Sequence, residues 1–240
     1  MVSLIIEQPS ELGYELMRRG VMAKKILDKS VRALVSIPTA SLSDSLDRLG
    51  IRGFMSHEIR PLGKYARIAG PAVTIKDTPA TEKMMPLLAI EAIDSAPKGS
   101  IVVRSVEGTD PRDIGLWGGL MSQAAKVRGI QAAVLDGGSR DLVEAATMRF
   151  PIYARSVVPT TSVGRTKVSA INVQIECGGI TVAPGDLVVA DVDGVVVIPK
   201  EKLPEVLKLA QEIDKIEKTE AVELRRGNKM TEVIQKHARM

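Results

Sequence analysis

The spacing of hydrophobic and polar positions changes several times along the chain, and each change predicts a new element. The clearest helix is ASLSDSLDRLG, residues 40–50, whose leucines share one face and which ends in a glycine. Strands are predicted at residues 67–76, 100–106, 130–136 and 151–157, and helices at 84–96, 115–129 and 140–150. Because strands alternating with helices are typical of βαβ units, we expect an α/β core with a partly parallel sheet.

The pattern differs after about residue 165. Three strand runs, at residues 167–176, 178–191 and 194–201, are separated by Gly-Gly, Pro-Gly-Asp and Asp-Gly. Such short, glycine-rich connections favour successive hairpins over βαβ units.

The two ends of the chain are predicted to be helical. Residues from about 10 to 35 suit one or two amphipathic helices. From residue 202 onward a stripe of apolar residues among lysines and glutamates predicts a long helix, and a short helix is expected after Gly227. Since no long linker divides the chain, we expect a single domain.

Composition narrows the classes of function. The 240 residues are 45% hydrophobic and carry a formal net charge of +4, so the chain can bury a substantial core. Lysines and arginines are spread along the chain and aromatic residues are few. Because a nucleic-acid site usually shows a clustered basic footprint, we expect no nucleic-acid partner.

The low numbers of cysteine and histidine residues also narrow the possibilities. A single cysteine indicates a reducing compartment, and two histidines leave oxygen atoms as the expected ligands of any metal. Cys177 is alone, which fits a buried structural thiol in a cytoplasmic protein. The segment MVSLIIEQPS lacks the features of a leader, and no window approaches the ~18 apolar residues of a membrane span. With only His57 and His237 available, a His-rich zinc site or a Ser-His-Asp triad is disfavoured.

The segment AVLDGGSRDLVEA, residues 133–145, is the first candidate site. A strand-like run meets a predicted helix start, where free N–H groups and the helix dipole favour an anion. Arg140 could bind a carboxylate through two parallel hydrogen bonds. Asp141 and Glu144 share a helical face and could both reach a divalent cation. Acidic residues in a first helical turn are also favoured by the dipole alone, so spacing leaves both interpretations open.

A second candidate is the glycine-rich segment GLWGGLMSQAAKVRG. Gly118 and Gly119 precede or open a helix, so backbone N–H groups around Leu120 and Met121 could bind part of an anionic ligand. The alternative is a tight loop with Trp117 packed over it.

Other acidic residues have simpler explanations. Asp44 and Asp47 suit a solvated helix face. Asp186, Asp191 and Asp193 surround predicted hairpins, where Asp-Gly is first of all a turn former. We assign none of them to a metal.

The two candidate segments combine into one longer pattern. Gly119 is followed by twenty residues, then Arg140-Asp141, then two residues and Glu144. This G-x20-R-D-x2-[ED] spacing resembles class II pyruvate aldolases similar to 4-hydroxy-4-methyl-2-oxoglutarate aldolase, within the RraA-like family. Other similar segments are TASLSDSLDRLG, GPAVTIK, LWGGLMSQAAKVRGIQAAVLDGGSRD and PGDLVVADVDGVVVIP.

The resemblance covers about residues 36–200 and implies a fold. We expect an α/β protein with an αββα sandwich of the swivelling β/β/α type, as a single domain with flanking N- and C-terminal helices. The RraA-like domain would span residues 1–240, with a C-terminal helical extension at about 202–240. Family members form trimers or hexamers with sites near subunit boundaries, so a homo-oligomer is expected, with a further acidic residue supplied by a neighbouring subunit.

Carried over position by position, the resemblance also implies roles. Arg140 would bind the carboxylate of a small 2-oxo acid and, with Asp141, form the catalytic pair. Asp141 would bind Mg²⁺ or Mn²⁺, partly through water, and Glu144 would support the metal's water shell. The substrate-binding residues implied in this way are Gly118, Gly119, Leu120, Met121 and Arg140.

The implied activity is that of a divalent-metal-dependent carbon–carbon lyase. It would release pyruvate from substrates of the 4-hydroxy-4-methyl-2-oxoglutarate type, from oxaloacetate by decarboxylation, or from both, through a metal-stabilised enolate. One position departs from the family: many aldolase members carry Asp or Glu where this chain has Gly119. Since glycine cannot transfer a proton, the departure weakens the expectation of aldol cleavage more than that of decarboxylation.

Three alternatives belong to other classes. An RraA-type regulator would bind a ribonuclease without chemistry, but such regulators lack the acidic metal residue that Asp141 supplies here. A methyltransferase is disfavoured because no G-x-G-x-x-G follows the first strand. A phosphohistidine carrier is disfavoured because neither His57 nor His237 lies in a glycine-rich turn.

Overall fold

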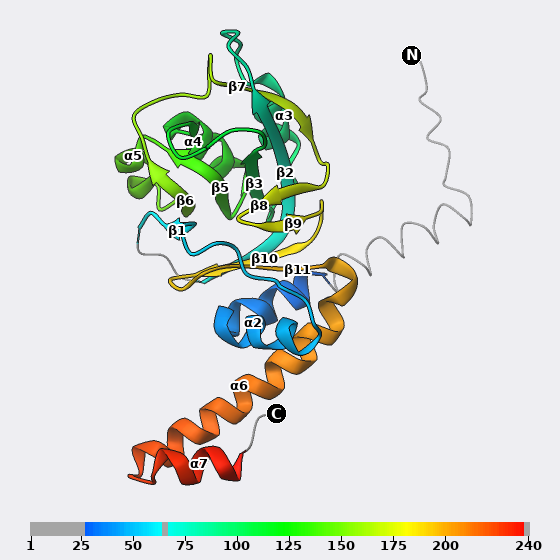
Figure 1. Ribbon diagram of the computed structural model, residues 1–240, viewed down its shortest axis with the longest axis vertical. Coiled ribbons are helices and arrows are strands. Elements are labelled where there is room, and N and C mark those ends of the chain that lie inside the picture. The colour runs from blue at the N-terminus through cyan, green and yellow to red at the C-terminus, as the bar shows by residue number, and fades with distance from the viewer. Residues whose placement is uncertain (1–26, 64–66, 238–240) are drawn as a thin grey trace, which may run out of the picture.

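A bent sheet of nine strands and a two-stranded ribbon lie at the centre of the computed structural model, which describes residues 27–63 and 67–237 (Figure 1). The strands of the sheet are β1 (Arg60–Pro61), β2 (Ile68–Pro79), β3 (Ile101–Val106), β4 (Gly115–Trp117), β5 (Ala132–Ser139), β6 (Ile152–Val157), β7 (Thr166–Ile171), β10 (Leu187–Asp191) and β11 (Gly194–Ile198). The ribbon pairs β8 (Ile175–Cys177) with β9 (Ile180–Val182).

Helices lie on both sides of this β structure. They are α2 (Thr39–Arg48), α3 (Leu87–Ser95), α4 (Gly119–Arg128), α5 (Leu142–Thr147), the short 3₁₀ helix Lys200–Lys202, α6 (Leu203–Arg225) and α7 (Met230–Lys236). Residues 27–36 are also helical.

The main path of the sheet runs β1-β6-β5-β3-β2-β10-β11. Its centre, β6-β5-β3-β2, is parallel, and β4 adds in parallel beside the end of β5. All six residues of β3 are buried, as expected for a strand covered on both faces in a parallel sheet. The antiparallel strands β1, β7, β10 and β11 surround this centre.

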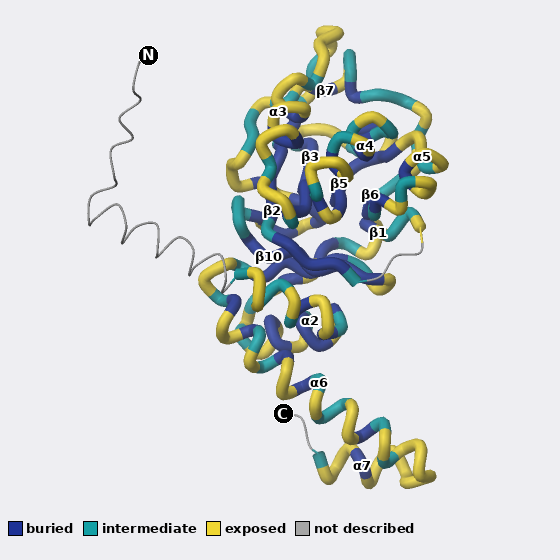
Figure 2. The backbone as a smooth tube through the Cα atoms, turned by 180° about the vertical axis from the view of Figure 1, so that it is seen from behind, coloured by how far each residue is buried: buried dark blue, intermediate teal, exposed yellow. Residues whose placement is uncertain are grey.

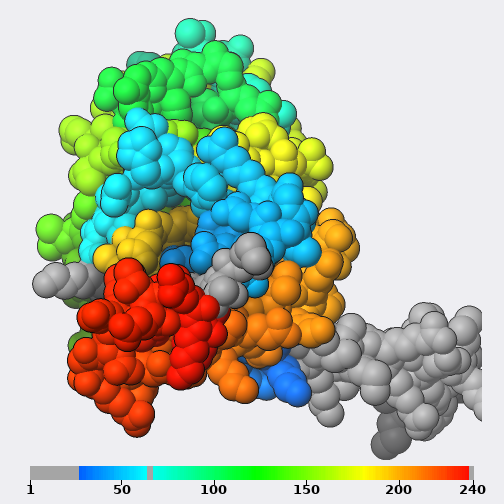
Figure 3. All heavy atoms as spheres, turned by 60° about the horizontal axis from the view of Figure 1, so that its bottom comes forward, coloured from blue at the N-terminus to red at the C-terminus, as the bar shows by residue number. Residues whose placement is uncertain are grey.

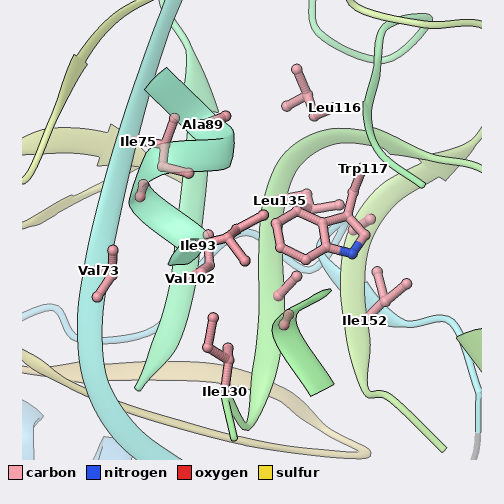
Figure 4. Packing of buried hydrophobic residues seen from close by; sticks show 14 of the residues in the cluster. Val73, Ile75, Ala89, Ile93, Val102, Leu116, Trp117, Ile130, Leu135 and Ile152 are labelled. Carbon is pink, nitrogen blue, oxygen red and sulfur yellow. The ribbon is translucent and has the colours of Figure 1, made fainter. Parts of the chain in front are cut away.

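The first hydrophobic core lies between the parallel strands and helices α3, α4 and α5. Figure 4 shows the Trp117 ring among Ile93, Leu135 and Ile152. Trp117 is 1% exposed and stacks on Phe150, with ring centroids 6.0 Å apart. Trp117 is therefore a core residue at the end of a strand, and it does not cover a tight loop as the alternative interpretation expected.

Two further cores lie on opposite faces of the β10–β11 hairpin. Val188 and Val195 face the parallel strands and the β8–β9 ribbon, whereas Val189 and Val196 face α2 and α6. Because side chains alternate along a strand, each strand of the hairpin contributes to both cores. Figure 2 shows β10 as a buried band between the two lobes of the molecule. The resulting order of layers, helix, sheet, hairpin and helix, confirms the predicted αββα sandwich.

The C-terminal helices extend away from the sheet. The first turns of α6 pack on α2, and α7 folds back on the far end of α6, where Lys236 and His237 contact Glu223 at 2.8 and 2.9 Å. Figure 3 shows this end of the molecule, with α7 and the end of α6 gathered below the segment around residue 50. The predicted long helix and following short helix are confirmed.

Several predicted boundaries are wrong, for tertiary reasons. Residues 115–117 form β4 instead of opening a helix, because they pair with Gly138 and Ser139. The same pairing extends β5 through Ser139, three residues beyond the predicted end at Asp136. The helix predicted at 140–150 is confined to Leu142–Thr147.

The strand predicted at 167–176 also divides in two. Asn172 has a φ of 52° and separates β7 from β8. β7 then pairs with β2, so it is not part of a hairpin with β8. The helices predicted at 10–35 lie outside the described residues except for the helical stretch from residue 27. Across residues 27–63 and 67–237 no helix has the length and apolarity needed to cross a membrane.

Candidate functional site

The candidate site lies where β5 ends and α5 begins, at the carboxyl ends of the parallel strands. The backbone N–H of Arg140 donates to the carbonyl of Trp117 at 3.0 Å, which fixes the turn against the end of β4. Asp141 follows in the left-handed region, at φ 56° and ψ 42°, which aspartate tolerates better than most residues. The turn therefore directs Arg140 and Asp141 toward the start of α4.

The two glycine-containing segments meet at this point. The N–H of Gly119 donates to Asp141 Oδ2 at 2.9 Å, and Arg140 Nε lies 3.5 Å from the same oxygen. A Cβ at position 118 would come within 2.8 Å of Asp141 Oδ2 and 3.2 Å of Arg140 Nε. Gly118 is thus the residue that allows both side chains to approach the backbone.

A pocket of about 340 Å³ opens beside this contact. It is small for a ligand site, since such pockets run from roughly 300 to 1,000 Å³. The side chains of Arg140 and Asp141 are 43% and 42% exposed and remain accessible to a ligand. All five predicted substrate-binding residues line it, together with Asp141: Gly118, Gly119, Leu120, Met121 and Arg140.

Glu144 lies at the edge of this arrangement. It is exposed and does not line the pocket. A Cβ at Gly119 would lie 3.3 Å from the Cβ of Asp141 and 3.4 Å from that of Glu144, so both acidic residues border position 119. In the described part of the chain, no group of three or more His, Cys, Asp or Glu side chains is placed to hold a metal ion.

A buried ion pair beneath the pocket escapes the sequence analysis. Arg104 on β3 donates through Nε and Nη2 to Asp77 Oδ2, at 3.1 and 2.7 Å, and through Nη1 to the carbonyl of Leu116. Asp77 Oδ1 has no hydrogen-bond partner among the described residues. Arg104 also lines the pocket, and its bond to Leu116 supports β4 just before Gly118. The available signal was the arginine inside the apolar run SIVVRSV, because a charge is buried only when it is paired.

A second support passes through Trp117. Its indole Nε1 donates to Ser122 Oγ at 2.9 Å, and that hydroxyl donates to the carbonyl of Gly118 at 3.1 Å. The first N–H groups of α4 have no carbonyl partner within the helix. The residues that carry them, Gly119, Leu120 and Met121, line the pocket. The site therefore combines one accessible arginine, one anchored carboxylate and a helix N-terminus.

The other acidic residues considered in the sequence behave as expected. Asp44 and Asp47 are exposed. Asp186 accepts from the backbone N–H groups of Ala183 and Lys200 at 2.8 and 3.1 Å, and so closes a turn.

Asp191 accepts from both the backbone N–H and the hydroxyl of Thr39 and from Arg67 Nε. Burial acts to raise the pKa of Asp191, but these hydrogen bonds outweigh it and leave the pKa below its ordinary value of 3.8.

Cys177 and His57 are also not part of the site. The thiol of Cys177 is fully buried, and burial raises its pKa well above the ordinary value of 9.0. His57 is exposed and lines a different hollow, next to Arg52 and Phe54.

Fold and pocket together define a class of protein. It is an α/β sandwich with a small pocket outside the carboxyl ends of its parallel strands, where α/β sheets commonly bind ligands. The chain belongs to the RraA-like family: the family model described as Aldolase/RraA matches residues 39–197. The predicted family is therefore confirmed.

Known relatives give the same assignment. A protein of Halalkalibacterium halodurans, provisionally named 4-hydroxy-4-methyl-2-oxoglutarate aldolase, is 36% identical over 176 residues, which cover 73% of this chain and 79% of that protein. An uncharacterized protein of Methanocaldococcus jannaschii is 36% identical over 137 residues, which cover 57% of this chain and only 65% of that protein.

A solved structure shares the fold. Streptomyces coelicolor RraAS2, described as an unusual member of the RNase ES inhibitor RraA protein family, superposes with a TM-score of 0.71 at 28% identity. The match covers 80% of this chain and 94% of RraAS2. The family thus includes proteins named for catalysis and proteins named for inhibition of a ribonuclease.

Proposed function

We propose that this protein is a divalent-metal-dependent carbon–carbon lyase that releases pyruvate from 2-oxo acids. The observation that carries the proposal is the open pairing of Arg140 with Asp141 at the N-terminus of α4. A planar guanidinium binds a carboxylate through two parallel bonds, and the helix N-terminus adds further donors for an anion. The aldolase names of relatives support the same reaction class.

The residues at the pocket fit a hard cation such as Mg²⁺ or Mn²⁺. Asp141 uses Oδ2 to accept from Gly119, which leaves Oδ1 without a hydrogen bond among the described residues. Glu144 borders position 119 together with Asp141, and in this proposal it supports the cation through water. Mg²⁺ is commonly bound by one or two carboxylates, with water and substrate completing its shell. The chemistry that a bound cation would supply here is Lewis acidity toward the 2-oxo group.

Each residue then has a defined task. Arg140 binds the substrate carboxylate, and the N–H groups of Leu120 and Met121 orient its oxygen atoms. Asp141 is held by Gly119 and keeps one oxygen directed to the cation. Gly119 itself offers no side chain to transfer a proton, so oxaloacetate decarboxylation, which demands less of a general base, is the more accessible reaction.

A homo-oligomer is part of the proposal. Near their starts, α3, α4 and α5 each expose a large apolar side chain: Leu87 is 68%, Leu120 85% and Val143 78% exposed. Exposed apolar patches of this kind mark interaction surfaces. We propose that a second copy of the chain covers them in a trimer or hexamer, which works in the cytoplasm without a nucleic-acid or membrane partner.

The experiment is a pyruvate-release assay on oxaloacetate and 4-hydroxy-4-methyl-2-oxoglutarate, with Mg²⁺ or Mn²⁺ and again with EDTA. We expect metal-dependent turnover that falls by about 100-fold or more in Asp141→Ala, because the anchored carboxylate is lost. Asp193→Ala is the matched control and should keep full activity, because Asp193 lies in the turn between β10 and β11 and does not line the pocket. The absence of turnover on any 2-oxo acid, with tight binding to a ribonuclease, would instead support the regulatory alternative that the likeness to RraAS2 suggests.

A further inference from the structure

The pocket has two unlike halves on either side of the first turn of α4. One half carries Arg140 and Asp141, from the β5–α5 turn. The other half comes from the start of α3 and from the loop between β6 and β7. The apolar side chains that line this second half are Met85, Pro86, Ile90 and Val163.

Among the described residues that line the pocket, Arg140 is the only cation available to a ligand. The guanidinium of Arg104 is only 1% exposed and is already bonded to Asp77 and to the carbonyl of Leu116. Two cations flank the apolar half without lining the pocket. The stem of Lys83 lies against Gly164, and Arg165 Nη1 donates to the carbonyl of Thr161 at 3.2 Å.

A dicarboxylic 2-oxo acid of five or more carbons, such as 2-oxoglutarate, fits this arrangement poorly. Its first carboxylate would bind Arg140, and its second would lie among methionine, proline, isoleucine and valine side chains, with only the neutral side chains of Thr161 and Ser162 beside them. Placing a carboxylate there without a charged partner removes hydration that two neutral hydroxyl groups do not fully replace. An alkyl chain in the same place gains free energy from every methylene removed from water.

We propose that the pocket is selective for 2-oxo acids whose far end is an alkyl chain, namely 4-hydroxy-2-oxo acids with an aliphatic substituent at C4. This substrate class rests on the proposed lyase function. In the cleavage, the C3–C4 bond breaks and the 4-hydroxyl gives its proton to water as C4 becomes an aldehyde carbonyl. The bonding electron pair passes to the pyruvate enolate, which takes up one proton at C3. The products are pyruvate and an aliphatic aldehyde, and no oxidant or reductant is needed.

Binding can be tested without turnover, because 2-oxo acids that lack a 4-hydroxyl cannot be cleaved in this way. Calorimetric titration of each 2-oxo acid into the protein measures its Kd. We expect the Kd to fall about threefold to fourfold for each added methylene in the series 2-oxobutanoate, 2-oxopentanoate and 2-oxohexanoate. 2-Oxoglutarate, which has as many carbons as 2-oxopentanoate, should bind at least about tenfold more weakly. Equal or tighter binding of 2-oxoglutarate would overturn the proposal, as would a Kd that does not change along the series.

A charge introduced into the apolar half should reverse this preference. Ile90→Lys places an ammonium group on the wall of the pocket, and we expect it to strengthen 2-oxoglutarate binding and weaken 2-oxohexanoate binding. Val127→Lys is the matched control, since Val127 is 82% exposed on α4 and does not line the pocket. A similar change of preference in both variants would mean that the apolar half does not select the ligand.

The cleavage assay separates this proposal from the one on which it rests. Faster pyruvate release from 4-hydroxy-2-oxoheptanoate than from 4-hydroxy-4-methyl-2-oxoglutarate supports both. Metal-dependent release that favours the dicarboxylic substrate keeps the lyase function and rejects the alkyl selectivity. If no substrate is cleaved but the alkyl series still binds in the predicted order, the lyase function fails while the pocket's selectivity stands.

Discussion

The segment DGGSRD, residues 136–141, and the segment DVDG, residues 191–194, both end or follow buried strands and both place aspartates beside glycines. At the second segment, Asp191 accepts hydrogen bonds from Thr39, Arg67 and the N–H of Asp193, and its side chain is 9% exposed. At the first, Asp141 accepts one hydrogen bond, from Gly119, and its side chain is 42% exposed.

The difference lies in what packs against each turn. The start of α2 lies on Asp191 and takes up its oxygen atoms as a structural tie. The start of α4 lies beside Asp141 but contributes only one N–H, and a pocket remains open next to it. Similar residue types therefore stabilise the fold at one turn and leave an exposed carboxylate beside a pocket at the other.

The largest expected effect concerns Asp77, whose buried carboxylate is paired with Arg104 beneath the pocket. Arg104→Leu leaves Asp77 as an unpaired buried charge, so we expect the free energy of unfolding to fall by about 3–5 kcal/mol. Urea denaturation measures this loss. The double variant Asp77→Leu/Arg104→Met should recover most of it, since both charges are then absent. A loss below about 1 kcal/mol for Arg104→Leu would contradict a structural role for the pair.

The next effect compares the two turns directly. Asp191→Asn should lower the free energy of unfolding by about 1–3 kcal/mol, because charge-assisted bonds to Thr39 and Arg67 are weakened. Asp141→Asn should change it by no more than about 0.5 kcal/mol, since asparagine also tolerates the left-handed conformation. Thermal and urea unfolding of both variants provide the test. Comparable losses at the two positions would remove the distinction between a structural and a ligand-facing aspartate.

A smaller effect is expected from Arg140→Lys. The ammonium group keeps the charge but loses the two-pronged geometry, so oxalate should bind about tenfold more weakly while stability is unchanged. Calorimetric titration in the presence of Mg²⁺ measures the affinity. Arg112→Lys is the matched control, because Arg112 pairs with Asp110 on the surface and does not line the pocket. Unchanged oxalate affinity in Arg140→Lys would exclude Arg140 from carboxylate binding.

The smallest effect is the pH dependence of the structural turn. Because the folded pKa of Asp191 lies below its ordinary value of 3.8, its contribution to stability is complete above that pH and is lost as the pH falls through the folded pKa. The stability difference between wild type and Asp191→Asn should therefore be constant near neutrality and narrow in acid. Unfolding curves at several pH values test this, and a difference that widens in acid would contradict the assigned hydrogen bonds.

Much of the fold was predictable from local pattern. The periodicity of residues 40–50 predicted α2, and the continuous apolar run at 100–106 predicted the buried strand β3. The predicted boundaries were wrong where hydrogen bonding between strands outweighed the local preferences of the residues. β4 is a three-residue strand in a glycine-rich segment, and β5 continues through two glycines because β4 and β6 supply its hydrogen-bond partners.

The candidate site was also only partly predictable, because spacing along the chain identifies some of its residues and not the buried residues that support them. Arg140, Asp141 and Gly119 were selected from spacing and resemblance, and the structure brings them together around one carboxylate oxygen. Their roles in binding substrate and metal remain predictions. Arg104 was missed because a single arginine in a strand carries no periodic signal, although its burial makes it part of the support of the pocket.

Sequence alone determined the α/β class, the family and the identity of the residues at the β5–α5 turn, because these depend on residue type and on spacing along the chain. Tertiary structure alone decided which aspartates keep oxygen atoms free. It also decided that Arg104 forms a buried ion pair with Asp77 and that one half of the pocket is lined mainly by apolar side chains. The physical reason is that hydrogen-bond partners and burial come from segments far apart in the chain, such as Thr39 for Asp191, 152 positions away.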